Sequence, residues 1–179
     1  MRLGATITDV RVVAGVAGGR KLQAPAGRDI RPTSDRVREA IFSSLESMDA
    51  VGGASVVDLF CGSGALGIEA LSRGAASATF VDNEPAAIDA VKANLAATGL
   101  DGGEVVRADA VRWLDGGAAF DLALVDPPYS FNAWDVVFSR LRAKILVAES
   151  NRDLEIPSPW RIVRHKRYGG TVVHLAASE

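Results

Sequence analysis

The chain has 179 residues, of which 48% are apolar and 23% charged, a composition typical of one globular domain. Its single cysteine excludes an internal disulfide, and one cysteine with two histidines cannot form a Cys/His zinc site. No apolar run reaches the roughly 20 residues of a membrane span, and the start of the chain lacks a signal-peptide pattern. The net charge of −2 is unevenly spread: residues 1–42 carry +4, residues 43–159 carry −9 and residues 160–179 carry +3. We therefore expect a cytoplasmic protein, without metal or membrane contact, whose basic ends could meet a polyanion.

The first 33 residues are predicted to form a β-hairpin followed by a linker. Apolar residues in 6–13 and a return segment at 20–23 flank a glycine-containing turn, and residues 24–33 contain two prolines and a glycine. We expect residues 1–33 to be a small appendage and residues 34–179 to be the main domain.

The remainder of the chain alternates between predicted helices and strands. Ser34 or Asp35 can cap a helix whose apolar residues recur at helical spacing up to Met48. Five strands are then predicted at 55–60, 78–81, 104–106, 122–125 and 145–147, with helices at 65–73, from Pro85 to Gly99, and at 132–142. This alternation predicts an α/β fold with a mostly parallel sheet and helices on both faces. Residues 161–168 and 171–175 flank Gly169-Gly170 and should form an antiparallel hairpin at one edge.

A glycine-rich loop follows the first of these five strands and opens a helix. Residues 62–67, Gly-Ser-Gly-Ala-Leu-Gly, fit the spacing G-x-G-x-x-G, which in this context is typical of a nucleotide-type cofactor site. Asp58 stands four residues before Gly62, where a carboxylate would repel a pyrophosphate but attract an ammonium or sulfonium group. The loop therefore favours a cofactor without phosphate.

Two further carboxylates end the next two strands. Asp82 stands where a carboxylate can accept both hydroxyls of a ribose, and Asp109 or Ala110 can meet an adenine edge. A solvated strand end or a helix cap is the alternative for each carboxylate taken singly. Together with the glycine loop, the carboxylates call for a nucleoside with a positive tail, such as S-adenosylmethionine. The candidate cofactor-binding residues are Asp58, Phe60, Cys61, Gly62, Ser63, Gly64, Asp82, Asn83, Asp109 and Ala110.

A stiff Asp-Pro-Pro-Tyr turn, residues 126–129, follows the fourth strand directly. The two prolines end the strand and restrict the backbone before them. The Asp126 carboxylate and the Pro127 carbonyl can each accept one N–H of an exocyclic amine, and Tyr129 can stack on a planar base, a contact worth about 1–3 kcal/mol. We expect Asp126, Pro127, Pro128 and Tyr129 to hold the acceptor and align its nitrogen with the donor's methyl group.

These motifs resemble those of a class I, Rossmann-like S-adenosylmethionine-dependent methyltransferase of the branch that acts on exocyclic amines. More narrowly, the chain resembles the RsmD family of bacterial 16S rRNA guanine-N2 methyltransferases. The resemblance rests on residues 11–22, 31–42 and 58–73, on the Asp-Pro-Pro-Tyr turn and on Glu149-Ser150. The glycine loop marks only the superfamily, whereas residues 31–42 narrow it to the family.

The resemblance implies methylation of the 2-amino group of guanine 966 in 16S rRNA, within the small ribosomal subunit or its assembly intermediate. It also implies that the N-terminal hairpin binds RNA. We expect the enzyme to act as a monomer, although the sequence itself leaves the oligomeric state open. Arginine contacts to phosphate supply affinity without sequence information, and the target base must leave its stack. The candidate RNA-binding residues are Arg11, Arg20, Lys21, Arg31, Arg36 and Arg38. In one respect the chain departs from the family, since residues 130–144 are fewer than the pattern leads us to expect.

Three other interpretations remain open on sequence alone. The same turn serves enzymes that methylate adenine N6 or a protein glutamine, although the short chain leaves no room for a DNA-recognition domain. An NAD-dependent oxidoreductase can share the glycine loop, but Asp58 and the lack of a catalytic His or Tyr-Lys pair argue against it. A nonenzymatic RNA chaperone with a vestigial pocket would not need Asp58, Asp82 and Asp126 together.

Overall fold

The computed structural model describes residues 10–26 and 33–179. In chain order its elements are β1 (Val10–Arg11), β2 (Lys21–Leu22), α1 (Asp35–Ser47), β3 (Ser55–Leu59), α2 (Ala65–Ser72), β4 (Ser77–Asp82), α3 (Pro85–Thr98), β5 (Gly103–Arg107), α4 (Ala110–Trp113), a 3-10 turn (Leu114–Gly116), β6 (Ala119–Val125), α5 (Trp134–Arg140), β7 (Arg142–Ser150), β8 (Trp160–Tyr168) and β9 (Thr171–Ser178). No helix among the described residues is both long and apolar enough to span a membrane.

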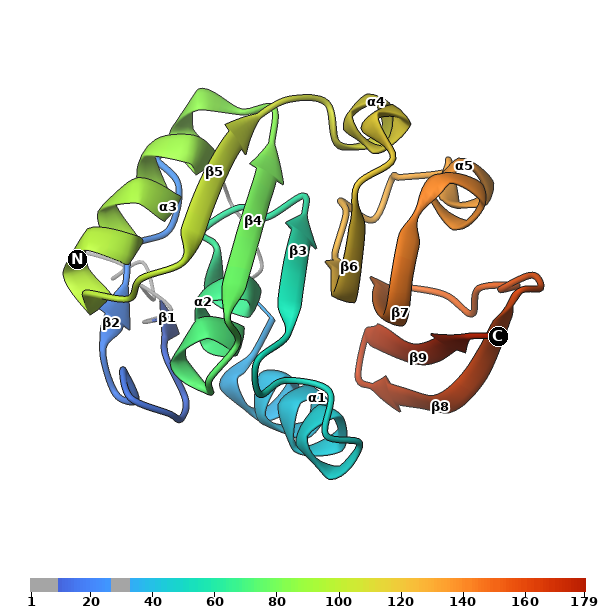
Figure 1. Ribbon diagram of the computed structural model, residues 1–179, viewed down its shortest axis with the longest axis horizontal. Helices are drawn as coiled ribbons and strands as arrows, with labels where there is room; N and C mark the ends of the chain where they lie inside the picture. Colours follow the sequence, from blue (N-terminus) through green and yellow to red (C-terminus); the bar gives the residue numbers. More distant parts are fainter. Residues whose placement is uncertain (1–9, 27–32) are drawn as a thin grey trace, which may run out of the picture.

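A seven-stranded sheet in the order β5-β4-β3-β6-β7-β9-β8 crosses the molecule (Figure 1). The pairs from β5 to β7 are parallel, and β9 pairs antiparallel with both β7 and β8. The predicted α/β fold, its mostly parallel sheet and the antiparallel C-terminal hairpin are therefore confirmed.

The two faces of the sheet bury different side chains because neighbouring residues of a strand point to opposite faces. In β3, Val56 belongs to one buried cluster, with side chains of α1, α2 and α3, whereas Val57 belongs to the other, with side chains of α4 and α5. Leu122 and Ala123 of β6 divide in the same way. The strands thus carry almost continuous apolar runs, as expected for a sheet covered on both faces.

The described part of the N-terminal hairpin is confirmed as two antiparallel strands, each of two residues. The predicted strand residues before Val10 and most of the predicted linker lie outside the described residues. Val12 and Leu22 are buried in the same cluster as α1 and α2, so the hairpin shares a core with the main domain. Gly15 makes this contact possible: its φ is +85°, and a Cβ there would lie 2.0 Å from the carbonyl oxygen of Ser72.

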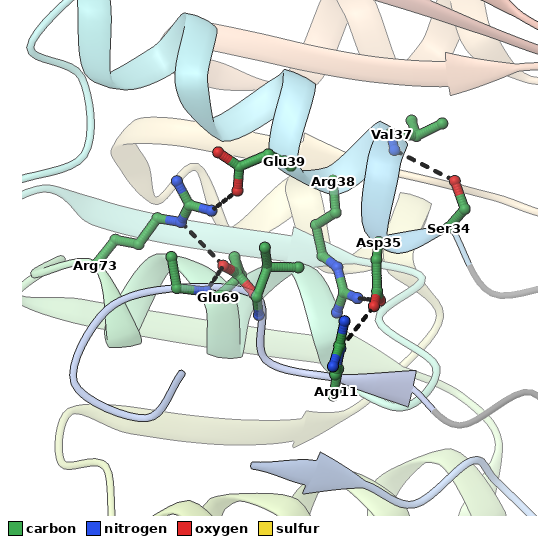
Figure 2. A network of polar contacts seen from close by, with 10 residues as sticks. Arg11, Ser34, Asp35, Val37, Arg38, Glu39, Glu69 and Arg73 are labelled. Atoms are coloured by element: carbon green, nitrogen blue, oxygen red, sulfur yellow. Dashed lines mark hydrogen bonds and ion pairs between the residues drawn. The ribbon is translucent and has the colours of Figure 1, made fainter. Parts of the chain in front are cut away.

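Polar contacts fasten the same hairpin to α2, as Figure 2 shows from close by. The N–H groups of Val13 and Ala14 donate to the two carboxylate oxygens of Glu69, at 2.9 and 3.0 Å. Arg73 donates from Nε to the same carboxylate at 2.9 Å and from Nη2 to Glu39 at 2.7 Å. These contacts satisfy the buried carboxylate of Glu69 from both the backbone and a cation.

Two local predictions differ from the structure. The short α4 and the 3-10 turn after it were not predicted, because seven residues capped by Asp109 are too short to show helical periodicity. The predicted helix 132–142 ends at Arg140, and Leu141 alone, with an extended backbone, connects it to β7. Trp134, Val137 and Phe138 are buried, so this short segment packs as a regular part of the domain.

Candidate active site

The carboxyl ends of four neighbouring parallel strands bring together four acidic side chains. Asp82 ends β4, Asp58 lies near the end of β3, Asp126 follows β6 and Glu149 lies near the end of β7. Val125 pairs with Ala148 in the sheet, so Asp126 and Glu149, the next residues of the two strands, are neighbours at the same edge. This is the edge at which open parallel sheets bind ligands.

The glycine loop between β3 and α2 turns sharply through left-handed backbone positions. Gly62 and Gly64 have φ values of +54° and +79°, and even Phe60, a residue with a side chain, has a φ of +58°. The Cys61 N–H donates to the carbonyl of Val81 at 3.1 Å, which ties the loop to β4. A non-glycine residue with positive φ is uncommon and marks a loop held by its surroundings.

Gly67 allows the first turn of α2 to pack directly on the sheet. A Cβ at this position would lie 2.4 Å from the Phe80 ring and 3.1 Å from Oδ2 of Asp58. The Gly67 N–H donates to the same Asp58 oxygen at 2.9 Å. The third glycine of the motif therefore permits the close helix–strand approach that brings α2 against Asp58.

Asp58 is 1% exposed, and the Gly67 N–H is the hydrogen bond that the structure gives its side chain. Burial raises the pKa of the Asp58 carboxyl well above its usual range, and the nearby carboxylates of Asp126 and Asp82 raise it further. A cation bound at this position would relieve both effects. The charge and burial of Asp58 therefore favour a positively charged ligand, and its role in binding the cofactor stays a prediction.

The buried carboxylate of Asp82 organises the loop and the start of α3. One of its oxygens accepts the Gly62 N–H and the other accepts the Glu84 N–H, both at 3.0 Å. Each carboxylate oxygen has a further lone pair, so these bonds leave capacity for ribose hydroxyls. Asn83, beside it, is exposed.

Asp109 is exposed and caps α4, accepting the N–H of Arg112 at 2.9 Å, while Ala110 is buried in the core. The local cap that the sequence offered as an alternative for Asp109 is therefore present. Whether this corner also contacts an adenine stays a prediction.

Cys61 is buried within the glycine loop. Burial raises the pKa of its thiol far above the usual range, and the carboxylates of Asp58 and Asp82 add to the effect. Its thiol stays protonated at neutral pH, so it serves the loop as a small neutral side chain rather than as a nucleophile.

The Asp-Pro-Pro-Tyr turn places its polar groups as a rigid corner beside Asp58. Asp126 is partly exposed, and burial raises the pKa of its carboxyl to about 6. The Pro128 carbonyl accepts the Phe131 N–H at 2.8 Å, whereas the Pro127 carbonyl accepts no hydrogen bond from the described residues. The Tyr129 side chain is 41% exposed, and its hydroxyl lies 3.0 Å from Oγ1 of Thr171. The corner thus presents two acceptors and an exposed ring.

The structure adds Thr33 and Glu149, two residues for which the sequence suggested no role. Thr33 precedes α1, and its Oγ1 lies 2.9 Å from Oε2 of Glu149 and 3.2 Å from Oδ2 of Asp126. Both residues lie in segments that carried the family resemblance, but nothing local in the sequence indicates that they meet Asp126. The contacts span 93 and 116 residues of chain.

Among the candidate RNA-binding residues, the described ones are either exposed or buried. Arg11, Arg20, Lys21 and Arg36 are exposed, and Arg31 lies outside the described residues. Arg38 needs a correction, because its side chain is fully buried and its Nη2 pairs with Asp35 (Figure 2). A guanidinium in that position does not reach a phosphate of bound RNA.

Comparison with known proteins decides the family. The family model described as conserved hypothetical protein 95 matches residues 10–177. The ribosomal RNA small subunit methyltransferase D of Escherichia coli strain K12 is 32% identical over 95% of this chain and 90% of its own length. The enzyme of the same name from Haemophilus influenzae is 33% identical over 90% of each chain. The chain belongs to the RsmD family.

Solved structures agree with this RsmD assignment. The methyltransferase structure YhhF from Escherichia coli has a TM-score of 0.84 and 32% identity, covering 96% of this chain and 98% of its own. The Thermus thermophilus 16S rRNA N2 G1207 methyltransferase RsmC, solved with AdoMet and guanosine, has a TM-score of 0.72 over 96% of this chain and half of its own. At 22% identity, that second likeness shows the shared fold. The chain is thus an enzyme of an rRNA methyltransferase family, and its α/β fold is that of such methyltransferases.

Proposed function

We propose that this RsmD-family protein transfers a methyl group from S-adenosylmethionine to the exocyclic N2 of guanine 966 in 16S rRNA. The observation that carries the proposal is the placement of the Asp126-Pro127 corner beside the buried Asp58 at the carboxyl edge of the sheet. The position beside Asp58 suits a cationic donor, and the Asp126-Pro127 corner suits an aromatic amine. The names of the curated relatives support rRNA of the small subunit as the substrate.

The described residues fit S-adenosylmethionine. Its positive charge would offset the negative charge of the buried carboxylates at the strand ends, which raise one another's pKa. Asp58 would attract the cationic tail, Asp82 would accept the ribose hydroxyls, and the loop from Phe60 to Gly64 would lie along the nucleoside. When bound, this cofactor supplies an electrophilic methyl group on a sulfonium.

The Asp-Pro-Pro-Tyr turn would bind the amine and orient it for methyl transfer. The Asp126 carboxylate and the Pro127 carbonyl each accept one N–H, which turns the nitrogen's lone pair out of the ring system. Pro128 stiffens the turn, and Tyr129, whose hydroxyl lies near Thr171, offers its ring for stacking on the base. The Asp126 carboxylate would also accept the proton that the amine loses when it takes the methyl group. Alignment and electrostatics supply most of the rate enhancement.

The RNA would meet the basic surface of the N-terminal hairpin. Arg11, Arg20 and Lys21 are exposed on the hairpin, and Arg36 is exposed in the first turn of α1. Cations at such positions bind phosphates without reading sequence. We propose that residues 1–33 form this RNA-binding part and that residues 34–179 carry the chemistry, as a monomer in the cytoplasm acting on the small subunit. The division is one of role, since the hairpin and the domain share a core.

The direct test uses small subunits and naked 16S rRNA from cells that lack the gene. The purified protein and labelled S-adenosylmethionine are added, and the modified nucleotide is mapped by nuclease digestion and mass spectrometry. We expect one N2-methylguanine, at position 966. Methylation of adenine, of a protein amide or of a different guanine would contradict the proposal, as would binding of NAD in place of S-adenosylmethionine by calorimetry.

A further inference from the structure

A single hydroxyl joins two carboxyl groups beside the amine-binding corner. Thr33 Oγ1 lies within hydrogen-bond distance of both Asp126 and Glu149, at 3.2 and 2.9 Å. A threonine hydroxyl has one hydrogen to donate, and its remaining capacity is as an acceptor. If both carboxyl groups were ionised, one of them would face the hydroxyl's lone pairs with no hydrogen between them. The geometry is satisfied when one carboxyl group carries a proton and donates it to Thr33.

We propose that Asp126, Thr33 and Glu149 form a proton-sharing unit in which Glu149 holds the proton and leaves Asp126 ionised. Glu149 then donates through Oε2 to Thr33 Oγ1, and the Thr33 hydroxyl donates to Oδ2 of Asp126. Oδ1 of Asp126 remains free to accept the amine of the base. Glu149 is thus a positioning residue that acts through Thr33, and its role rests on the proposed function of Asp126.

The surroundings of the two carboxyl groups favour this assignment over its reverse. Glu149 is 3% exposed and its Oε1 has no hydrogen-bond partner among the described residues, whereas Asp126 is partly exposed. An unpaired buried oxygen costs far less free energy on a neutral carboxyl than on a carboxylate. The proton therefore belongs on the more deeply buried group.

The charged groups around Glu149 act in both directions. Burial raises the pKa of the Glu149 carboxyl well above its usual range, the charges of Asp126 on β6 and Asp58 on β3 raise it further, and Arg38 on α1 lowers it. Asp82 on β4 bears on this group through Asp58, whose pKa it raises. Burial raises the pKa of the Asp126 carboxyl as well, so both carboxyl groups that meet the Thr33 hydroxyl have a raised pKa, and the deeper burial of Glu149 with its unpartnered Oε1 assigns the shared proton to Glu149.

The decisive experiment titrates the protein alone, with ¹³C-labelled carboxyl groups observed by NMR. At pH 7.5 we expect Glu149 to show the chemical shift of a protonated carboxyl and Asp126 that of a carboxylate. In the wild type each resonance should also report the titration of the other. In Glu149→Gln the Asp126 resonance should lose the step that reports Glu149, and in Thr33→Val that step should shrink to what the direct charge interaction leaves. An ionised Glu149 at pH 7.5, or an Asp126 titration identical in all three proteins, would overturn the proposal.

Activity supplies the second readout. Glutamine can donate an N–H to Thr33 as the protonated glutamate does, so Glu149→Gln should keep the methyl-transfer rate within roughly tenfold of wild type. Glu149→Ala should lose about 100-fold, because Asp126 loses its orientation. Equal losses in the two variants, with folding verified by NMR, would show that a carboxylate is needed and would contradict the proton-sharing unit. Glu104→Gln, an exposed glutamate on β5, is the matched control.

The two readouts separate this proposal from the proposed function. If the protein fails to methylate guanine 966 but the titration behaves as expected, the substrate assignment is wrong and the proton-sharing unit stands. If guanine is methylated and Glu149 proves ionised, the reverse holds.

Discussion

Two regions of this molecule bury carboxylates, and they treat them in opposite ways. Glu69 on α2 is fully buried, and its two oxygens receive two backbone N–H groups and the Arg73 guanidinium. At the carboxyl edge of the sheet, Asp58 receives one backbone N–H, and Asp126 and Glu149 share one hydroxyl. Glu69 is saturated, whereas Asp58, Asp126 and Glu149 receive fewer donors and form no ion pair among the described residues.

The two sets of buried carboxylates differ because one supports the structure and the other is available to a ligand. A saturated carboxylate stabilises its surroundings, because its charge is offset within the protein. An unsaturated one is held at a cost in free energy that a bound ligand can relieve. The carboxyl edge is therefore prepared for a cationic donor and an amine, while Glu69 fastens the hairpin to the domain.

Among the variants discussed, we expect Asp126→Ala to have the largest effect, which acts on the site at the carboxyl edge of the sheet. We expect methyl transfer to fall roughly 10³-fold, because the amine loses its charged acceptor, while S-adenosylmethionine affinity stays nearly unchanged. Single-turnover kinetics and calorimetry measure the two quantities. Asp135→Ala, an exposed acidic residue on α5, is the control. Equal loss of cofactor binding and activity would refute the role given to Asp126.

Glu69→Gln tests the structural side. The amide cannot accept both hairpin N–H groups and the Arg73 guanidinium, so we expect the free energy of unfolding to fall by about 3 kcal/mol. Urea denaturation measures it, with Glu39→Gln, the exposed partner of Arg73, expected to lose about 0.5 kcal/mol. A loss no larger than that of the control would mean that the hairpin is held by its apolar contacts alone.

Asp58→Asn should separate stability from binding. The raised pKa means that folding opposes ionisation of this carboxyl, so its cost to stability is present at pH 7 and disappears below the ordinary aspartate pKa of about 4. The variant should therefore unfold at a higher temperature than wild type at pH 7 but not at pH 3.5, while S-adenosylmethionine affinity falls roughly 100-fold. Unchanged affinity would remove the cationic-ligand argument.

Asp121→Asn provides the smallest expected effect. Lys144 at 2.7 Å and the Ser55 N–H and hydroxyl lower the pKa of Asp121 to about 2. A carboxyl with a lowered pKa contributes stability above its ordinary pKa, and this is lost as the pH falls through about 2. Because the pair is solvent-exposed, we expect a loss of only about 0.5 kcal/mol at pH 7, vanishing near pH 2. Urea titrations at both pH values check it, and a persistent difference at pH 2 would contradict the ion-pair explanation.

Local sequence patterns were sufficient to predict the fold, the glycine loop and the Asp-Pro-Pro-Tyr turn, but not the contacts of Thr33 and Glu149. The alternation of helices and strands from residue 55 onward predicted the parallel sheet, and the glycine loop and the Asp-Pro-Pro-Tyr turn were visible because each is a continuous segment. Asp58, Asp82 and Asp109 were expected at one edge because the ends of parallel strands meet there, and the turn that begins with Asp126 follows another strand of the same sheet. The helix predicted for 132–142 was too long at both ends, since helix boundaries depend on tertiary packing.

The sequence by itself therefore determined which strand ends carry carboxylates and that the Asp-Pro-Pro-Tyr turn is stiff. Neighbouring residues in the chain decide the first property, and the backbone restrictions of proline decide the second. Only the tertiary structure decided that Thr33 meets Asp126 and Glu149, that Glu69 anchors the hairpin and that Arg38 is buried. These contacts join segments far apart in the chain, and their protonation and burial depend on how the sheet and α1 pack around them.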